Sequence, residues 1–245
     1  MDFKKGNDGI EEPIRIYQNN SGVLTDNAVW SSIDADRTES IAWGDYDNDG
    51  DLDLAAGNAG WGNFGAASRV YRNDNGTLTT NSVWSSAETA WTTAIAWGDY
   101  DNDGDLDLAL GNFGSPTRIY QNNAGSLSDA AVWSSFESVQ IQTIAWVDID
   151  SDGDLDLICG SRGLDGLFIH ENRQGTLTKK AAQLIESNGY IWTMALADVD
   201  GDGDLDLATN ESLLLNYRDH KSIAKIPGNS STPLVQISRP QPPKN

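Results

Sequence analysis

The chain has 245 residues, of which 38% are hydrophobic and 9% aromatic, a composition typical of a folded globular protein. Its formal net charge of −21 argues against nucleic acid as a partner, because phosphate backbones are bound by basic surfaces. The same charge opposes adsorption to anionic membranes, and no apolar run reaches the roughly 18 residues that suggest a membrane span. We therefore expect neither nucleic-acid binding nor membrane insertion.

The first segment, residues 1–13, is polar and is predicted to be disordered. It lacks the basic region and the apolar core of a secretory signal peptide. The chain is therefore either cytoplasmic or a piece of a longer protein. Cys159 is the only cysteine, so no disulfide can form within the chain and the redox compartment stays open.

Residues 14–38 are predicted to be part of a repeated unit. The segments that begin at Arg15 (Arg-Ile-Tyr-Gln-Asn) and at Val29 (Val-Trp-Ser-Ser) recur further along the chain, the first at Arg69 and Arg118. The second recurs at 83–86 and 132–135. No Asp-rich loop precedes the first copies, so the chain enters this unit halfway through.

Four further repeats are predicted to start near residues 39, 93, 142 and 192. The stretch 41–54 recurs at 95–108, 144–157 and 194–207, with corresponding residues 49 to 54 positions apart. Apolar residues at 52, 54 and 56 alternate with Asp53 and Ala55, the two-residue period of a β-strand. A period of about 50 residues that holds four strands is typical of propeller blades. We predict an all-β fold, a β-propeller built from four-stranded blades with a loop after the first strand of each repeat.

Tryptophans recur at two positions of the repeat and are predicted to fill the space between neighbouring blades, because a blade cannot bury both of its faces alone. Recurrence at equivalent positions favours this core role over the stacking of a ligand. The first set is Trp43, Trp97 and Trp146, with Leu196 in the last copy; the second is Trp30, Trp84 and Trp133.

The repeat pattern stops after residue 221. Five of the seven prolines lie between Pro227 and Pro243, a composition typical of a linker. We predict a propeller segment over residues 14–221 and a Pro- and Ser-rich linker or tail over residues 222–245, which often leads to another domain.

Each repeat contains a nine-residue loop with Asp at positions 1, 3, 5, 7 and 9 and Gly at position 6. These loops hold 20 of the 37 acidic residues, and the remaining 17 nearly balance the 16 Lys and Arg. So many carboxylates in four short loops would repel one another without a cation between them. The predicted metal ligands are Asp45, Asp47, Asp49, Asp51, Asp53, Asp99, Asp101, Asp103, Asp105, Asp107, Asp148, Asp150, Asp152, Asp154, Asp156, Asp198, Asp200, Asp202, Asp204 and Asp206.

The ion predicted for these loops is Ca²⁺, about four ions in all, because calcium takes six to eight oxygen ligands in a flexible shell. Magnesium requires a stricter octahedron, and zinc favours His or Cys. The loop begins like an EF-hand but lacks the Glu at position 12, where Ala56 and its equivalents stand. Position 9 is expected to close the site instead. Position 7 is expected to offer its backbone carbonyl and to leave its side chain near solvent.

These motifs resemble the FG-GAP or VCBS repeats of integrin-α-like β-propellers. The resemblance rests on the pattern Asp-x-Asp-x-Asp-Gly-x-x-Asp followed by Leu, and on the Gly-rich element at Gly57-Asn58 and at 111–114. It covers roughly residues 14–220. The Gly-rich element degrades in the third and fourth copies, at 160–161 and 209–210. The resemblance implies a calcium-loaded propeller, usually of seven blades, whereas this chain shows four loops and two partial units.

No catalytic constellation is evident, and we predict that the chain is not an enzyme. His170 and His220 are expected to be surface or turn residues, and Cys159 a small buried hydrophobe. Glu39, with the later glutamates at 88, 137 and 186, recurs once per repeat before the strand that leads to the loop, which indicates a structural role or a repeated contact. Asp165 and Glu171 are the unrepeated acids that would best suit catalysis.

Three functions stay open. The first is a non-catalytic extracellular or cell-surface module for binding or adhesion, with a glycan or a protein as its partner. The second is an accessory or catalytic domain of a polysaccharide-degrading enzyme, and the third is a structural spacer in a larger surface protein. Millimolar calcium outside cells favours an extracellular location. Further blades of a longer chain are one route to a closed ring, and pairing of residues 14–32 with the last repeat is the other.

Overall fold

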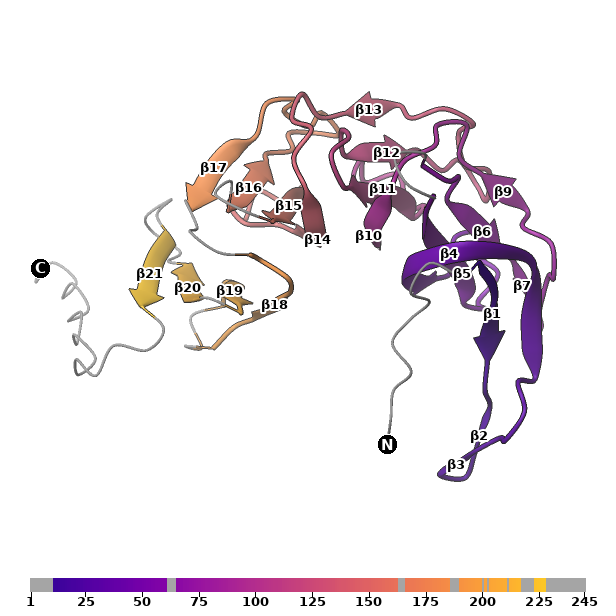
Figure 1. Cartoon of the computed structure of the whole chain (residues 1–245). Helices are drawn as coiled ribbons and strands as arrows, with labels where there is room; N and C mark the ends of the chain where they lie inside the picture. The colour runs from indigo at the N-terminus through magenta and orange to yellow at the C-terminus, as the bar shows by residue number, and fades with distance from the viewer. Residues whose placement is uncertain are drawn as a thin grey trace, which may run out of the picture.

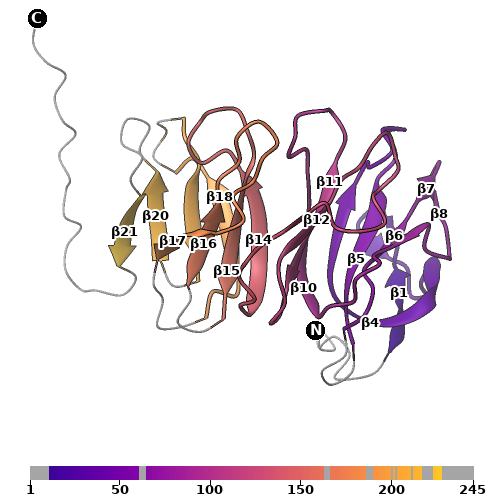
Figure 2. The same ribbon diagram turned by 90° about the horizontal axis from the view of Figure 1, so that it is seen from above.

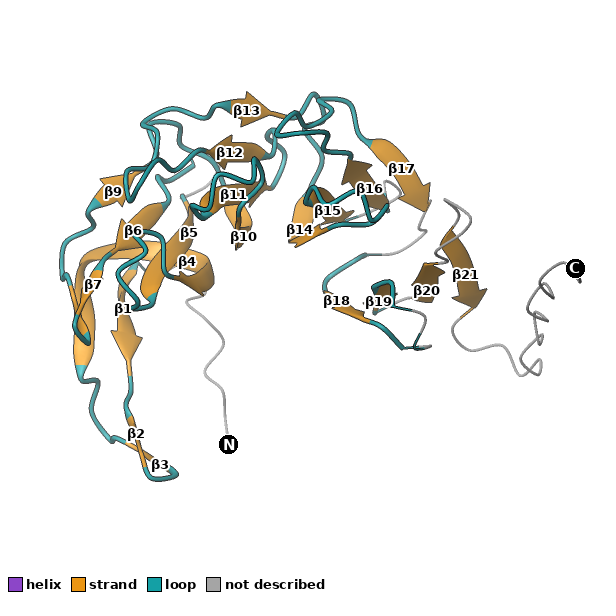
Figure 3. Cartoon of the chain, turned by 180° about the vertical axis from the view of Figure 1, so that it is seen from behind, coloured by secondary structure: helices purple, strands orange, loops and turns teal. Residues whose placement is uncertain are grey.

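The structure, a computed structural model, describes residues 11–60, 65–162, 166–185, 190–199, 201, 203–210, 212–216 and 223–227. Strands, turns and loops make up these residues, which confirms the all-β class (Figure 3). Within those ranges there is no helix that is long and apolar enough to span a membrane. The alternating apolar residues of the repeats therefore form strands, as their period predicts.

Four antiparallel sheets follow one another along the chain. The first contains β1 (Glu12–Ile16), β4 (Trp30–Gly44), β5 (Asp53–Ala59), β6 (Arg69–Tyr71) and β9 (Trp84–Ser85). The second contains β10 (Thr92–Gly98), β11 (Asp107–Asn112), β12 (Arg118–Tyr120) and β13 (Trp133–Ser134). The third contains β14 (Ile141–Val147), β15 (Asp156–Ser161), β16 (Leu167–His170) and β17 (Ala182–Ile185). The fourth contains β18 (Met194–Ala197), β19 (Asp206–Thr209), β20 (Ser212–Asn216) and β21 (Ile223–Pro227).

Two short hairpins complete the first part of the chain: β2 (Asn19–Asn20) with β3 (Val23–Leu24), and β7 (Asn73–Asp74) with β8 (Thr77–Leu78). The four sheets lie side by side along an open arc, with the sheet of β1 at one end and the sheet of β18 at the other (Figures 1 and 2). Strand β10 contacts β4 and β5, β14 contacts β10 and β11, and β18 contacts β14. Each repeat therefore packs on the one before it.

The long strand β4 belongs to two units. Its first half pairs with β1, with Arg15 opposite Ser31, and the same pairing recurs between β6 and β9, with Arg69 opposite Ser85. Its second half pairs with β5. Strand β1 and the start of β4 thus correspond to the third and fourth strands of a repeat.

The fourth repeat forms a four-stranded sheet without help from the start of the chain. Strands β20 and β21 occupy the third and fourth places of that sheet, so residues 14–32 have no vacant place to fill there. Strand β21 lies inside the segment expected as a linker from residue 222. The Ile-Ala-Lys-Ile stretch before Pro227 supplies the apolar residues of an outer strand.

Successive repeats pack through a Trp–Gly contact, which we call the seam. A Cβ on Gly44 would lie 2.6 Å from Trp97, and a Cβ on Gly98 would lie 2.4 Å from Trp146, so only Gly lets each indole approach. Trp97 also stacks on Tyr46 at position 2 of the preceding loop, with ring centroids 5.9 Å apart. These contacts confirm the inter-repeat role predicted for Trp97 and Trp146.

The third seam is aliphatic: Val147 replaces the glycine and Leu196 replaces the tryptophan. Both residues pack in one hydrophobic cluster with Ile149. Trp43 departs from the expected packing. It lies on the outer face of the first repeat and is about half exposed, because in this chain no strand that the structure describes covers that face.

The second set of tryptophans also joins neighbouring repeats. The indole N–H of Trp30 donates to the Leu78 carbonyl, and Trp84 and Trp133 make the corresponding bonds to Ser128 and Leu177. Each of these indoles lies within one repeat and bonds to the next, which confirms their predicted core role.

His170 is buried, contrary to the expectation of a surface position. It occupies the place of Tyr71 and Tyr120. Each of these residues lies opposite the equivalent leucine of the second strand in its own sheet and edge-on to a tryptophan of the preceding unit. Its imidazole replaces a core phenol, and this substitution conceals the repeat in the sequence. His220 lies outside the described residues.

The recurring acid also differs from the set read by sequence. Tyr120 donates its hydroxyl to Glu88, and Tyr71 donates to Asp34, so Asp34, not Glu39, is the first-repeat equivalent. Glu39 pairs with Arg37 instead. Glu186 lies outside the described residues. These contacts give the recurring acids a structural role.

Candidate metal centres

Each loop connects the first and second strands of its repeat, and two residues with positive φ give it its shape. In the first loop these are Asn48 at position 4 (φ 60°) and Gly50 at position 6 (φ 93°). The corresponding φ values at Gly201 and Gly203 in the fourth loop are 77° and 97°. Asn and Gly tolerate this left-handed region, so the sequence itself selects the turn.

The position-1 aspartate organises the turn. Asp45 accepts the backbone N–H of Asp49 at 3.0 Å and that of Gly50 at 2.9 Å. Asp99 and Asp148 accept the same pair of N–H groups in the second and third loops. In the fourth, Asp198 accepts the N–H groups of residues 201 and 203. The carboxylate therefore fixes the loop around itself.

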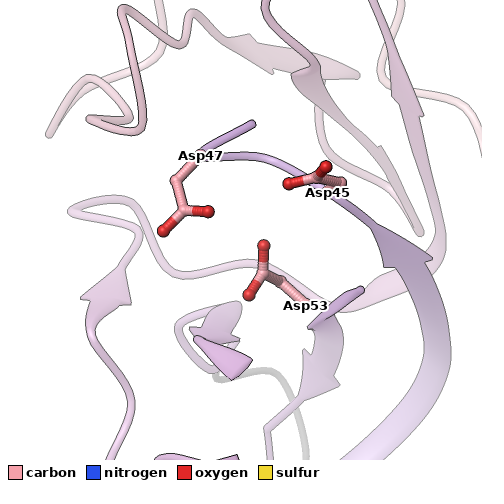
Figure 4. A group of neighbouring side chains, drawn as sticks. All are labelled: Asp45, Asp47 and Asp53. Carbon is pink, nitrogen blue, oxygen red and sulfur yellow. The ribbon is translucent and has the colours of Figure 1, made fainter. Parts of the chain in front are cut away.

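In each of the first three loops three carboxylates converge, those at positions 1, 3 and 9. In the first loop Asp45, Asp47 and Asp53 point toward one another (Figure 4), and their nearest oxygens all lie within 4.8 Å of one another. The same triads form at 99, 101 and 107 and at 148, 150 and 156. Three oxygens at this separation form half of a calcium shell of six or more.

The position-9 aspartate is buried at the start of the second strand. Asp53 accepts the N–H of Tyr46 with one oxygen and that of Asn73 with the other, and Asp107 and Asp156 make equivalent pairs. Desolvation by burial raises the pKa of Asp53 to about 6, that of Asp107 to about 7 and that of Asp156 to about 6. These carboxylates ionise reluctantly, and a nearby cation would favour their charged form.

Two position-3 oxygens are buried without any partner. Oδ1 of Asp47 and Oδ1 of Asp101 accept no hydrogen bond, and burial also raises the pKa of both carboxyls. An unpaired buried carboxylate oxygen is costly, so such an oxygen calls for an explanation. A divalent cation with oxygen ligands explains it, and the residues present therefore fit Ca²⁺. The residues that would hold it first are positions 1, 3 and 9.

The carboxylates at positions 5 and 7 do not join the triads that the structure shows. Asp49 accepts the N–H of Asp51 within the loop. The position-7 side chain of the second loop, which was expected to lie near solvent, makes two hydrogen bonds that are exposed to solvent. Asp105 accepts the N–H of Ala124 in its own repeat and the amide Nδ2–H of Asn48 in the preceding loop.

This link between loops recurs and was not foreseen from the sequence. Asn102 donates to Asp154 at 2.7 Å, and the hydroxyl of Ser151 donates to Asp204 at 3.4 Å. The preceding loop is held a second time by Asn122, which donates to the Tyr46 carbonyl. The recurring Asn that ends the Arg-x-Tyr-x-Asn motif was the available sign of this contact.

The fourth loop is described in part. Asp198, Asp204 and Asp206 lie within the described residues, and Asp206 accepts the N–H of Val199 as the other position-9 aspartates do at the corresponding N–H. Asp200 and Asp202 lie outside them. The metal ligands predicted at those two positions remain predictions.

The residues considered for catalysis do not form a site in the described part of the chain. Glu171 pairs with Arg173 on the surface, and Asp165 lies outside the described residues. Cys159 is buried, as predicted, and burial raises the pKa of its thiol to about 12. A thiol that stays protonated at neutral pH is not a nucleophile.

The sequence matches the family model of FG-GAP-like repeats over residues 6–56, 59–110, 101–159 and 148–209, and that of the FG-GAP repeat over residues 38–78. The chain belongs to the FG-GAP repeat family. In this family context the four sheets are propeller blades, and the loops lie at corresponding places in each. Comparison with curated protein sequences finds none that matches.

One solved structure shares the fold, and a second gives a weaker match. A lectin from Agrocybe aegerita, described as recognising non-reducing terminal N-acetylglucosamine, matches with a TM-score of 0.55 and 19% identity over 86% of this chain. The Vibrio cholerae biofilm matrix protein Bap1 matches with a TM-score of 0.48 and 18% identity over 76% of it. The chain spans 59% of the lectin and 31% of Bap1.

Proposed function

We propose that this chain is a calcium-binding β-propeller module that acts outside the cell, without catalysis, in binding or adhesion. The observation that carries the proposal is the recurrence of the aspartate triads in three successive loops. The unpartnered oxygens of Asp47 and Asp101 add independent support, because a surface acid has no reason to bury an unpaired oxygen. The loop ligands we propose extend to positions 5 and 7 and to all four loops.

The calcium ions would act as structural ties. When bound, each ion would neutralise a loop whose carboxylates now resist ionisation, and so stabilise the turn between two strands. The residues of the chain then hold the loops in register, since Asn122 and Asn48 connect one loop to the next repeat. The expected result is a rigid surface that presents loops at one end of every sheet.

A glycan is the partner that we favour, with an extracellular protein as the other candidate. The lectin that shares this fold is described as recognising non-reducing terminal N-acetylglucosamine, and this likeness supports a glycan partner by analogy of fold. A location outside the cell suits calcium sites of modest affinity, because calcium is millimolar there and far scarcer in the cytosol.

Thermal unfolding with millimolar calcium and with EDTA tests the calcium part. A ligand at one hundred times its Kd stabilises by about 2.7 kcal/mol per site when it binds only the folded state. We expect a large fall in Tm in EDTA that calcium reverses and magnesium does not. Equal Tm values in the two solutions would disprove structural calcium sites.

The variant Asp101→Asn tests one site and keeps the shape of the side chain. We expect isothermal titration to count one calcium ion fewer than in the unaltered chain, because a negatively charged ligand is lost from one triad. Asp129→Asn, at an exposed position outside the loops, is the matched control and is expected to bind the full number.

A glycan and matrix-protein array, run with calcium and with chelator, tests the binding part. Signals that chelation abolishes would support a calcium-dependent binding module. A chain that calcium stabilises but that binds nothing on the array would instead be a structural spacer.

A further inference from the structure

The outer face of the first repeat exposes residues whose equivalents in the later repeats are less exposed. Ile41 is 52% exposed and Trp43 47% exposed, whereas Ile95 and Ile144, the equivalents of Ile41, are buried. In the second repeat this face packs against the first through Trp97 on Gly44. The first repeat therefore carries the Trp side of a seam, and the glycine that would face Trp43 is not among the described residues.

The partial unit beside it is exposed in the same manner. Tyr17 is 47% exposed and Leu24 63% exposed, although their equivalents Tyr71 and Leu78 are buried. Tyr71 lies opposite Leu54 of the second strand in its sheet. Among the described strands β1 pairs with β4 alone and stands at the sheet edge, so none of them occupies the position of a second strand beside Tyr17.

The turn of the partial unit already has the form that receives an aspartate loop. Ser21 and Gly22 have φ values of 55° and 94°, and the matching residues Asn75 and Gly76 have 54° and 82°. In the first repeat, the N–H of Asn75 donates to Asp51 at position 7 of the loop. The turn at Ser21 thus offers an N–H group in the same backbone conformation.

We propose that the partial unit and the outer face of the first repeat together form a docking surface for the strand–loop–strand half of another FG-GAP-like repeat. That half-repeat would add its second strand to the open edge of β1. Its loop aspartates would accept N–H groups from the turn at Ser21, and its glycine would receive Trp43. One occupant therefore accounts for all the exposed positions: Tyr17, Leu24, Ile41 and Trp43.

The seam chemistry specifies which repeats fit. Trp97 requires Gly44, and Thr92 of the same strand requires a second glycine, since a Cβ on Gly57 would lie 2.8 Å from Thr92. The matching residues of the fourth repeat are Ala197 and Asn210. Both residues have a Cβ, which would overlap the side chains of Trp43 and of its strand. The occupant is therefore a repeat with glycine at both places, and not the fourth repeat of this chain or of a second copy.

The test adds such a half-repeat to the chain. Residues 92–117, which hold β10, its loop and β11, are joined directly to Arg15 in place of residues 1–14, because residues 117–118 match residues 14–15. Acrylamide quenching of Trp43 is obtained as the difference between each chain and its Trp43→Phe variant. We expect quenching of Trp43 to fall to the level of Trp97, Tm to rise, and one further calcium ion to bind.

The matched control is the same extension with Gly98→Ala and Gly111→Asn, which copies the fourth repeat. It is expected to leave Trp43 as accessible as in the unextended chain. The half-repeat is also supplied as a separate peptide with Trp97→Phe, so that a misfolded fusion does not decide the result. Protection of Trp43 by neither form overturns the proposal. Protection that appears in the unextended chain with dimer formation, followed by light scattering, assigns the surface to a second copy and also overturns it.

The quenching result does not depend on the proposed function. If Trp43 is protected but no further calcium binds, the docking surface stands and the calcium assignment fails. If every chain binds calcium but Trp43 stays accessible, the calcium assignment stands and the docking surface fails.

Discussion

At the scale of single residues, His170 shows what happens when one member of a repeated contact changes. In the second repeat, Tyr120 donates its hydroxyl to Glu88. In the third, His170 donates Nδ1–H to the Thr178 carbonyl, and Oε2 of Glu137 is buried without a partner. The third repeat therefore lacks a hydrogen bond that the second repeat has.

We expect His170→Tyr to stabilise the chain by about 1 kcal/mol at pH 7, because the phenol restores the bond to the buried glutamate. Urea unfolding measures the difference. A less stable variant at pH 7 would show that the imidazole is the better fit, and Glu137→Gln in both backgrounds identifies the partner.

The same substitution changes the pH dependence. Burial lowers the pKa of His170 below its usual value of about 6.5, so the folded state favours the neutral ring. The stability this contributes is fully present above the unfolded pKa and is lost as pH falls through the folded pKa. We expect His170→Tyr to show a smaller loss of stability between pH 7 and pH 5, measured by the same urea titrations.

At the scale of elements, the loops are linked through side chains of positions 4 and 7. Asn102 donates to Asp154 of the next loop, and its φ of 60° lies in the left-handed region. Gly201 holds position 4 in the fourth loop. Replacing Asn102 by Gly therefore keeps the backbone conformation and removes the amide alone.

We expect Asn102→Gly to lower the coupling between the second and third calcium sites. Titrations should show weaker cooperativity, and a double-mutant cycle with Asp154→Asn should give a coupling energy of about 1 kcal/mol. Asn123→Gly, in an exposed turn outside the loops, serves as control. Additive effects of the two substitutions would mean that the loops bind independently.

The sequence predicted the loops of the repeats but not all of the contacts between them. The Asp and Gly spacing located all four loops, because a turn with fixed φ values requires those residues at fixed places. The two-residue alternation after the loop indicated the strand that follows it, β5 in the first repeat. The contact from Asn48 to Asp105 was missed, since it joins residues 57 positions apart and depends on how two repeats stack. Burial of His170 was missed because imidazole is not a usual replacement for a core phenol.

At the scale of the whole molecule, the arc is set by the residues at each seam. The first two seams pair Gly with Trp, and the third pairs Val147 with Leu196. Each side of a seam is matched in volume to the other, so changing one side alone creates an overlap or a void.

We expect Gly98→Ala to destabilise the chain by about 1–3 kcal/mol, because the added Cβ meets Trp146. Adding Trp146→Leu should recover part of the loss, as it reproduces the aliphatic third seam. Thermal unfolding of the single and double variants measures both effects. Gly76→Ala is the comparison: Gly76 has a positive φ and open space around it, so its substitution shows the cost of backbone strain without steric overlap. A double variant that is no better than the sum of the singles would contradict the volume matching.

The bridging carboxylates described above have a mechanical consequence. Asp105 is bound at once to its own turn and to the loop before it, so each loop is a joint between two stiff sheets. Without calcium those joints hold mutually repelling charges and should flex. With calcium they should lock. The bending stiffness of the arc would then depend on the calcium concentration of the surrounding fluid.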